Sequence, residues 1–196
     1  MEIAEGIVIL DYVRTTLPLF RLPRGLEERT IVVLTTSSLS DDHTQTRPQN
    51  AGAQATQMNI YKNLDLKQWT HWTLPSGMLE KARKKGLYRN YYCEGITSEP
   101  LNIPNAFYDV ITVVGSHGPN HIKGEAVHEM IRLVKSGGYV CIVTRRENFE
   151  RIEDYKDTFF PMCDRLETDG KWRKVINESC PFFPGVEGIS LCYQIC

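Results

Sequence analysis

A short polar segment, Gly115-Ser116-His117, follows an apolar run and carries the side chains best suited to chemistry. A serine hydroxyl forms hydrogen bonds, and a histidine imidazole can take a proton near neutral pH. Glycine lets the backbone approach a ligand closely. The segment could therefore form one wall of a ligand site, with His117 as a general base. The alternative interpretation is a loop histidine that caps the next helix or faces solvent.

A second histidine, His121, follows His117 at a spacing of four residues, as in some metal sites. No third cysteine, histidine or carboxylate stands at a zinc-like spacing from this pair. The six cysteines include no C-x-x-C pair, and three of them fall in expected strands. This pattern indicates reduced intracellular thiols instead of disulfides or a zinc site, so we expect no metal ion.

The residues around this segment predict a strand, a helix and a second strand between residues 107 and 144. A run rich in β-branched residues, 110–114, favours a strand buried on both faces. Apolar residues recur at helical spacing over 124–134, and the Ser-Gly-Gly sequence at 136–138 is expected to stop that helix. The run 139–143 predicts the second strand. Such a unit builds a doubly wound sheet, which binds ligands at the carboxyl ends of its strands.

Further elements are expected on both sides of this unit. They are strands at 31–34, 91–97, 171–177 and 188–195, helices at 75–86 and 147–167, and a turn at 181–185. Ser76 is the expected N-cap of the first of these helices. Apolar residues alternate over 188–195, which is typical of an antiparallel strand with one solvated face.

The chain of 196 residues is long enough for one α/β domain and short for two. A polar stretch predicts a disordered linker over 41–58, which divides a divergent segment, 1–58, from a domain, 59–196. The formal net charge of −1 indicates no basic surface for nucleic acid. The sequence shows neither a signal peptide nor an apolar run of the roughly 20 residues that a membrane helix needs. We expect a soluble protein of the cytoplasm or nucleus.

Three segments in this order, 76–88, 108–115 and 134–145, resemble the methyltransferase-like proteins of the Williams–Beuren region. These proteins are class I S-adenosylmethionine-dependent methyltransferases, and the resemblance spans residues 59–196. It implies a Rossmann-like, mostly parallel sheet with an antiparallel C-terminal strand pair. It also implies S-adenosylmethionine as the cofactor and a small molecule or a protein as the methyl acceptor, which the sequence does not identify further.

The same resemblance implies which residues would hold S-adenosylmethionine. They are Thr73, Leu74, Met78, Ile96, Thr97, Gly115 and Ser116. The family binds the ribose through an acidic residue at the end of its second strand, and the matching position here is Thr73. Asp65 could substitute only if the chain over 66–74 bulges. Thr97 matches the position near the adenine amino group.

The family also holds the cofactor with a glycine-rich turn after its first strand, where backbone N–H groups approach the ligand. No G-x-G sequence stands upstream of Met78, and residues 35–42 contain no glycine. We expect that the first strand and its glycine loop are missing or replaced, with residues 31–34 filling the vacant position in the sheet. Two functions remain open: a methyltransferase, intact or impaired, and an inactive pseudoenzyme or truncated isoform that acts through protein contacts.

Overall fold

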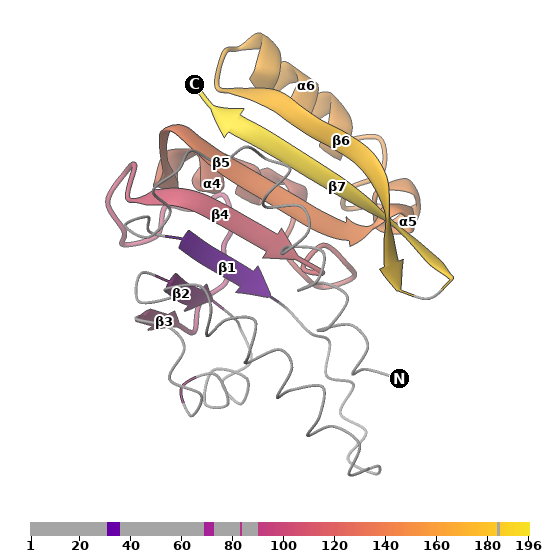
Figure 1. Ribbon diagram of the computed structural model, residues 1–196, viewed down its shortest axis with the longest axis horizontal. Helices are drawn as coiled ribbons and strands as arrows, with labels where there is room; N and C mark the ends of the chain where they lie inside the picture. The colour runs from indigo at the N-terminus through magenta and orange to yellow at the C-terminus, as the bar shows by residue number, and fades with distance from the viewer. Residues whose placement is uncertain (1–30, 36–68, 73–82, 84–89, 184) are drawn as a thin grey trace.

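The computed structural model describes residues 31–35, 69–72, 83, 90–183 and 185–196. These residues form a seven-stranded sheet with the order β3-β2-β1-β4-β5-β7-β6 (Figure 1). The strands are β1 (Ile31–Thr35), β2 (Trp69–Trp72), β3 (Asn90–Tyr92), β4 (Tyr108–Val114), β5 (Val134–Arg145), β6 (Trp172–Phe183) and β7 (Val186–Ile195). Neighbours from β3 to β5 pair in parallel, whereas β7 pairs antiparallel with both β5 and β6. The predicted parallel sheet with an antiparallel C-terminal pair is confirmed.

Strand β1 lies in the middle of the parallel part, between β2 and β4. Its first residue, Ile31, is in register with Trp69 on one side and Val110 on the other. The prediction that residues 31–34 fill the vacant sheet position is thus confirmed. A central strand of the sheet therefore comes from the segment 1–58, which the sequence analysis had divided from the domain 59–196. The predicted linker at 41–58 lies outside the described residues.

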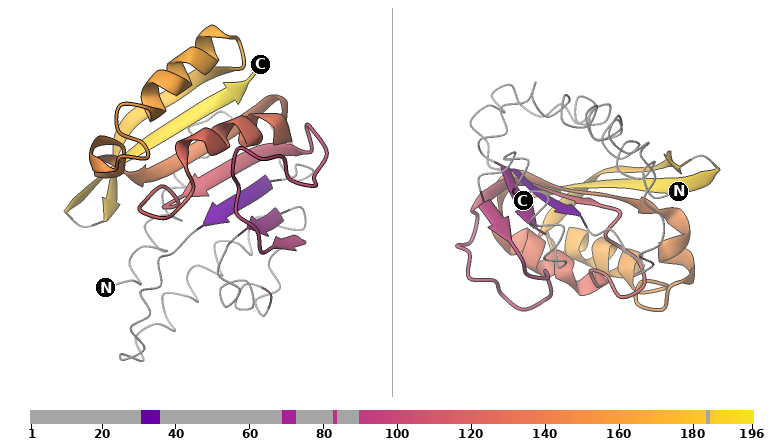
Figure 2. Two further views of the ribbon diagram at one scale, coloured as in Figure 1. Left: turned by 180° about the vertical axis from the view of Figure 1, so that it is seen from behind. Right: turned by 90° about the horizontal axis from the view of Figure 1, so that it is seen from below.

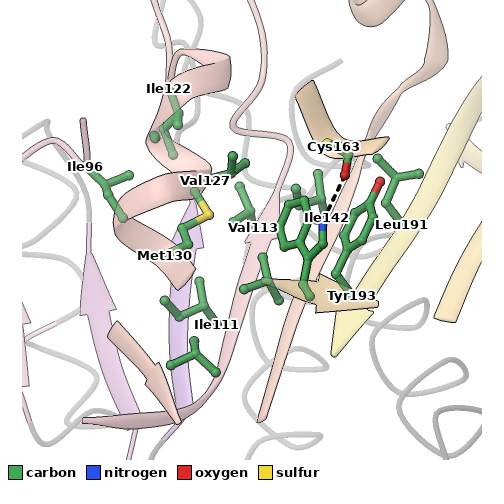
Figure 3. Close-up of a cluster of buried hydrophobic side chains, with 14 of the residues drawn as sticks. Ile96, Ile111, Val113, Ile122, Val127, Met130, Ile142, Cys163, Leu191 and Tyr193 are labelled. Atoms are coloured by element: carbon green, nitrogen blue, oxygen red, sulfur yellow. Dashed lines mark hydrogen bonds between the residues drawn. The ribbon is translucent and has the colours of Figure 1, made fainter. Parts of the chain in front are cut away.

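The described helices cover one face of this sheet (Figure 2). They are the short 3-10 helix η3 (Gly124–Ala126), α4 (Val127–Leu133), α5 (Arg146–Arg151) and α6 (Phe159–Thr168). Alternate residues of β4, β5 and β7 point toward them, so one core lies between the sheet and the helices, as the close-up in Figure 3 shows. Within this core the ring of Trp172 stacks on Tyr193 at 4.0 Å between centroids and donates a hydrogen bond to the Cys163 carbonyl at 3.0 Å.

The predicted glycine stop of the first helix is wrong. Helix α4 already ends at Leu133, and Val134 has extended backbone angles and begins β5. Gly137 and Gly138 lie inside β5, between Val134 and Tyr139, where the register of β4 and β5 shifts. Gly137 has a left-handed φ of 78°, and a Cβ on Gly138 would meet the Asp109 carbonyl oxygen at 2.5 Å. The two glycines therefore allow an irregular strand to pass close to β4.

Other boundaries also differ from the sequence predictions. The predicted turn at 181–185 is wrong in its length, because β6 continues to Phe183, which pairs with Val186. A register shift between Pro181 and Phe183 accommodates the proline, which cannot donate a ladder hydrogen bond and here lies in an outermost strand. Strand β3 is shorter than predicted and ends at Tyr92. The stretch 147–167 forms two helices, α5 and α6, instead of one.

Of the predicted helix at 75–86, only Arg83 is among the described residues. Within the described part of the chain, no helix is both long enough and apolar enough to cross a membrane.

Candidate functional site

The carboxyl ends of β1, β2, β3 and β4 meet at one edge of the sheet. The strand registers place Leu34 beside Trp72, and Trp72 beside Tyr92. They also place Thr35, the last residue of β1, beside Val114, the last residue of β4. Ligands of open parallel sheets bind at this type of edge, so it is the candidate site.

Gly115 turns the chain out of the sheet at this edge. Its φ of 65° lies in the left-handed region, which glycine adopts without the steric cost that a side chain brings. Its N–H group donates a hydrogen bond to the Val143 carbonyl at 2.8 Å, so the turn stays attached to β5. The backbone of Gly115 therefore lies at the edge and is held to β5.

The loop that follows is held by Tyr155, which lies between α5 and α6. The tyrosine hydroxyl accepts a hydrogen bond from the Gly118 N–H at 3.1 Å and donates one to the Ile122 carbonyl at 2.6 Å. The Ile122 N–H in turn donates to the Ser116 carbonyl at 3.1 Å. The loop is thus fastened at Gly118 and Ile122 to one buried hydroxyl group.

Two further side chains hold the backbone at His117. The Thr144 hydroxyl donates a hydrogen bond to the His117 carbonyl at 3.1 Å, and the Asn148 side-chain amide donates to the same oxygen. Sequence reasoning missed these two residues and Tyr155. The sequence offered one signal: Thr144 directly follows the predicted strand 139–143. Asn148 and Tyr155 fall in the predicted helical stretch 147–167, which gives no sign of their role.

The ring of His117 is fully enclosed, with 0% of its surface exposed. Its centroid lies 5.4 Å from that of Phe149 and 5.6 Å from those of Tyr155 and Phe159. Neither ring nitrogen has a hydrogen-bond partner among the described residues. Burial, together with the nearby His121, lowers the pKa of His117 to about 3, so the ring is neutral near pH 7.

This position contradicts the prediction that His117 is a general base, because an enclosed ring cannot reach an acceptor at the edge. The alternatives of a helix cap and a solvent-facing loop residue are also wrong. Helix η3 starts after Lys123 without any side-chain cap. The physical reason is that α5 and α6 place aromatic rings under the β4 loop, and these rings enclose the imidazole.

The remaining predicted cofactor residues have different positions. The side chain of Ile96 is buried in the core beneath the sheet, so it does not line the edge. Thr97 is exposed, and its hydroxyl accepts a hydrogen bond from the Glu99 N–H at 3.1 Å. Ser116 is buried. Thr73, the predicted ribose position, follows the last residue of β2 in the sequence, and Thr73, Leu74 and Met78 lie outside the described residues.

The described residues include no group of three or more histidine, cysteine, aspartate or glutamate side chains that could hold a metal ion.

Comparisons of sequence and of fold both relate the chain to methyltransferases. No family model matches the chain. Human methyltransferase-like protein 27 is 33% identical over 100 residues, which are 51% of this chain and 40% of that protein. The chain thus matches less than half the length of this relative.

Solved structures share the fold across nearly the whole chain. A SAM-dependent methyltransferase from Aquifex aeolicus superposes with a TM-score of 0.56 at 16% identity, covering 96% of this chain and 92% of that one. A 1,6-didemethyltoxoflavin-N1-methyltransferase from Burkholderia thailandensis, with bound S-adenosylhomocysteine, gives 0.54 at 12% identity, covering 97% and 79%. The chain therefore has the fold of the class I S-adenosylmethionine-dependent methyltransferases and resembles a methyltransferase-like protein in sequence.

Proposed function

We propose that this chain binds S-adenosylmethionine at the carboxyl edge of its sheet and transfers the methyl group to a small molecule or a protein. The observation that carries the proposal is the place of β1 between β2 and β4. With β1 in place, four neighbouring strands end at one edge, and this edge is where a doubly wound sheet binds its ligand. The similarity to a methyltransferase-like protein supports the same function.

Two residues that follow β3 and β4 in the sequence offer groups that suit the cofactor. The exposed hydroxyl of Thr97 can donate a hydrogen bond to an acceptor on the ligand, because its oxygen already accepts one from Glu99. Gly115 offers backbone without a side chain. The fit is poorer near β1 and β2, since residues 36–42 contain no glycine and Thr73 offers a neutral hydroxyl where a carboxylate would bind both ribose hydroxyls.

Bound S-adenosylmethionine supplies an electrophilic methyl group on a sulfonium. The residues of the chain would contribute alignment, because the Gly115 turn is fastened to β5 and the loop behind it to Tyr155. His117 does not take part in proton removal. The proposal therefore favours acceptors that are nucleophilic without a base from this loop, such as a thiolate or a neutral amine.

An inactive scaffold that acts through protein contacts is the second candidate. Two observations favour it: the segment after β1 lacks glycine, and Ile96, Ser116 and His117 turn their side chains into the protein. This function needs the fold but not the cofactor.

Calorimetric titration of the full chain with S-adenosylmethionine and with S-adenosylhomocysteine separates the two candidates. The methyltransferase proposal predicts saturable heat for both ligands and a rise in melting temperature when either is present. If millimolar concentrations of both ligands give neither heat nor a thermal shift, the scaffold function is the correct one.

A further inference from the structure

Two thiols lie side by side on the face of the sheet that the described helices leave uncovered. Cys141 of β5 is directly opposite Cys192 of β7, and their Sγ atoms are 3.4 Å apart. Their neighbours in sequence, Ile142 and Leu191, point into the core beneath the helices. Because successive side chains of a strand point to opposite faces, both cysteines project from the other face.

The antiparallel pairing of Cys141 with Cys192 is compatible with a disulfide. Directly opposed residues of an antiparallel pair have Cα atoms about 4.5 to 5.5 Å apart, within the usual disulfide range of about 4.4 to 6.8 Å. The two Sγ atoms would have to approach from 3.4 Å to the roughly 2.04 Å of an S–S bond. Rotation of the two side chains can supply this movement without any change in strand register.

We propose that Cys141 and Cys192 are an oxidation site, at which a peroxide converts the two thiols into a disulfide that links β5 to β7. One thiol loses its proton, and its sulfur attacks a peroxide oxygen, which gives a sulfenic acid and one water. The second sulfur then attacks the sulfenic sulfur and releases the other water. The two thiols lose two electrons and two protons in total, and hydrogen peroxide is reduced to two waters.

Burial determines which oxidant reaches the pair and how fast it reacts. Cys141 is 6% exposed and Cys192 is 0% exposed, so a molecule as small as hydrogen peroxide is favoured over a bulky disulfide such as oxidised glutathione. The hydrogen bond to Cys192 and burial both raise the pKa of the Cys141 thiol. Because the thiolate is the reactive form, the reaction is slow near neutral pH and accelerates as the pH rises.

The other cysteines have different surroundings. All six are free thiols in the structure. Cys163 lies in the core on the helix face, and Cys180 packs against Gly188 near the β6–β7 turn. Cys93 and Cys196 are exposed, so they would react first and join separate molecules. Cys141 and Cys192 are therefore the best candidates for an internal disulfide.

The test uses the full chain with the exposed thiols removed by Cys93→Ser and Cys196→Ser. The protein is treated with hydrogen peroxide at pH 7 and pH 9, its remaining thiols are alkylated in denaturant, and its peptides are mapped without reduction. We expect a linked pair of peptides containing Cys141 and Cys192, a mass loss of about 2 Da and faster formation at pH 9. We also expect the melting temperature to rise by roughly 5 to 10 °C and to return after reduction.

Two variants in the same background complete the test. Cys141→Ala removes one partner and should abolish both the linked peptide and the thermal shift. Cys163→Ala, a buried thiol on the other face, should retain the linkage if the variant folds. Alkylation of both Cys141 and Cys192 after exhaustive oxidation, or a bond from either one to Cys180, would overturn the proposal.

Discussion

The hydroxyl of Tyr155 accepts a hydrogen bond from the backbone N–H of Gly118 at 3.1 Å, across 37 positions of the chain. The same hydroxyl donates to the Ile122 carbonyl at 2.6 Å. One side chain beneath the sheet therefore holds the loop that leaves β4 at the candidate site. Because Tyr155 holds this loop from the helix-covered side of the sheet, we expect the loop to form a fixed wall of the site and not a lid.

Tyr155→Phe should destabilise the protein by about 1 to 3 kcal/mol, because the buried Gly118 N–H and Ile122 carbonyl lose their partner. Urea denaturation measures this change in the free energy of unfolding. Tyr139→Phe is the matched control, since among the described residues the Tyr139 hydroxyl accepts one hydrogen bond, from the Gln194 side chain at 3.1 Å. Its loss should cost no more than about 1 kcal/mol. Equal losses in the two variants would mean that Tyr155 has no special role in the loop.

The enclosed ring of His117 should make stability depend on pH. Its pKa is about 3 in the folded protein and 6.5 in an unperturbed histidine, so the unfolded state takes up a proton first as the pH falls. The stabilisation is therefore complete above pH 6.5 and is lost as the pH falls toward 3. This single group contributes a slope of up to about 1.4 kcal/mol per pH unit to the free energy of unfolding.

His117→Phe should remove that slope, because a phenylalanine ring can join the rings of Phe149, Tyr155 and Phe159 without titrating. Denaturant unfolding from pH 4 to pH 7.5 measures the effect. His121, whose pKa is also lowered by burial, remains in both proteins and contributes equally to each. The exposed His128→Gln variant should keep the wild-type slope. A wild-type slope in His117→Phe would show that the ring is not enclosed in solution.

The strand–helix–strand unit was predictable from sequence because its apolar periodicity is strong. The environment of His117 was not, since it depends on Phe149 and Phe159, which reach the ring from helices separate from β4. The extent of β5 was missed for a related reason. Glycine at 137 and 138 suits a helix end as well as an irregular strand, and only the approach of Asp109 decides between them.

The ion pair of Glu129 and Arg132 should be worth more than a surface pair. The Glu129 side chain is 2% exposed, and its two oxygens accept hydrogen bonds from Arg132 Nε at 2.7 Å and Nη2 at 2.6 Å. Arg132 also donates to the Ile103 carbonyl at 2.8 Å, which ties the loop before β4 to α4. Arg132→Met removes the cationic partner of the buried carboxylate, which keeps the hydrogen bond from the Leu101 N–H at 2.9 Å, so we expect a loss of about 3 kcal/mol in urea denaturation.

Lys135→Met is the control for this pair. Lys135 contacts Asp109 at 3.0 Å but is 46% exposed, so its removal should cost between about 0 and 1 kcal/mol. If both variants lose the same stability, the Arg132 pair behaves as an ordinary surface pair and does not organise the loop.

Gly115→Leu tests whether the cofactor binds where the strands end. A leucine there would fill the edge beside β4, so we expect at least about a tenfold loss in S-adenosylmethionine affinity by calorimetry, or about 1.4 kcal/mol. The substitution also strains the backbone, because φ is 65° at this position.

Gly170→Leu is the control. It carries the same strain at φ 66°, with no described atom within 4 Å of an added Cβ. Gly170 precedes β6, whose first residue pairs with Ile195 at the opposite edge of the sheet, so this control should lose stability but keep its affinity. Equal affinities in the two variants would place the cofactor site away from Gly115.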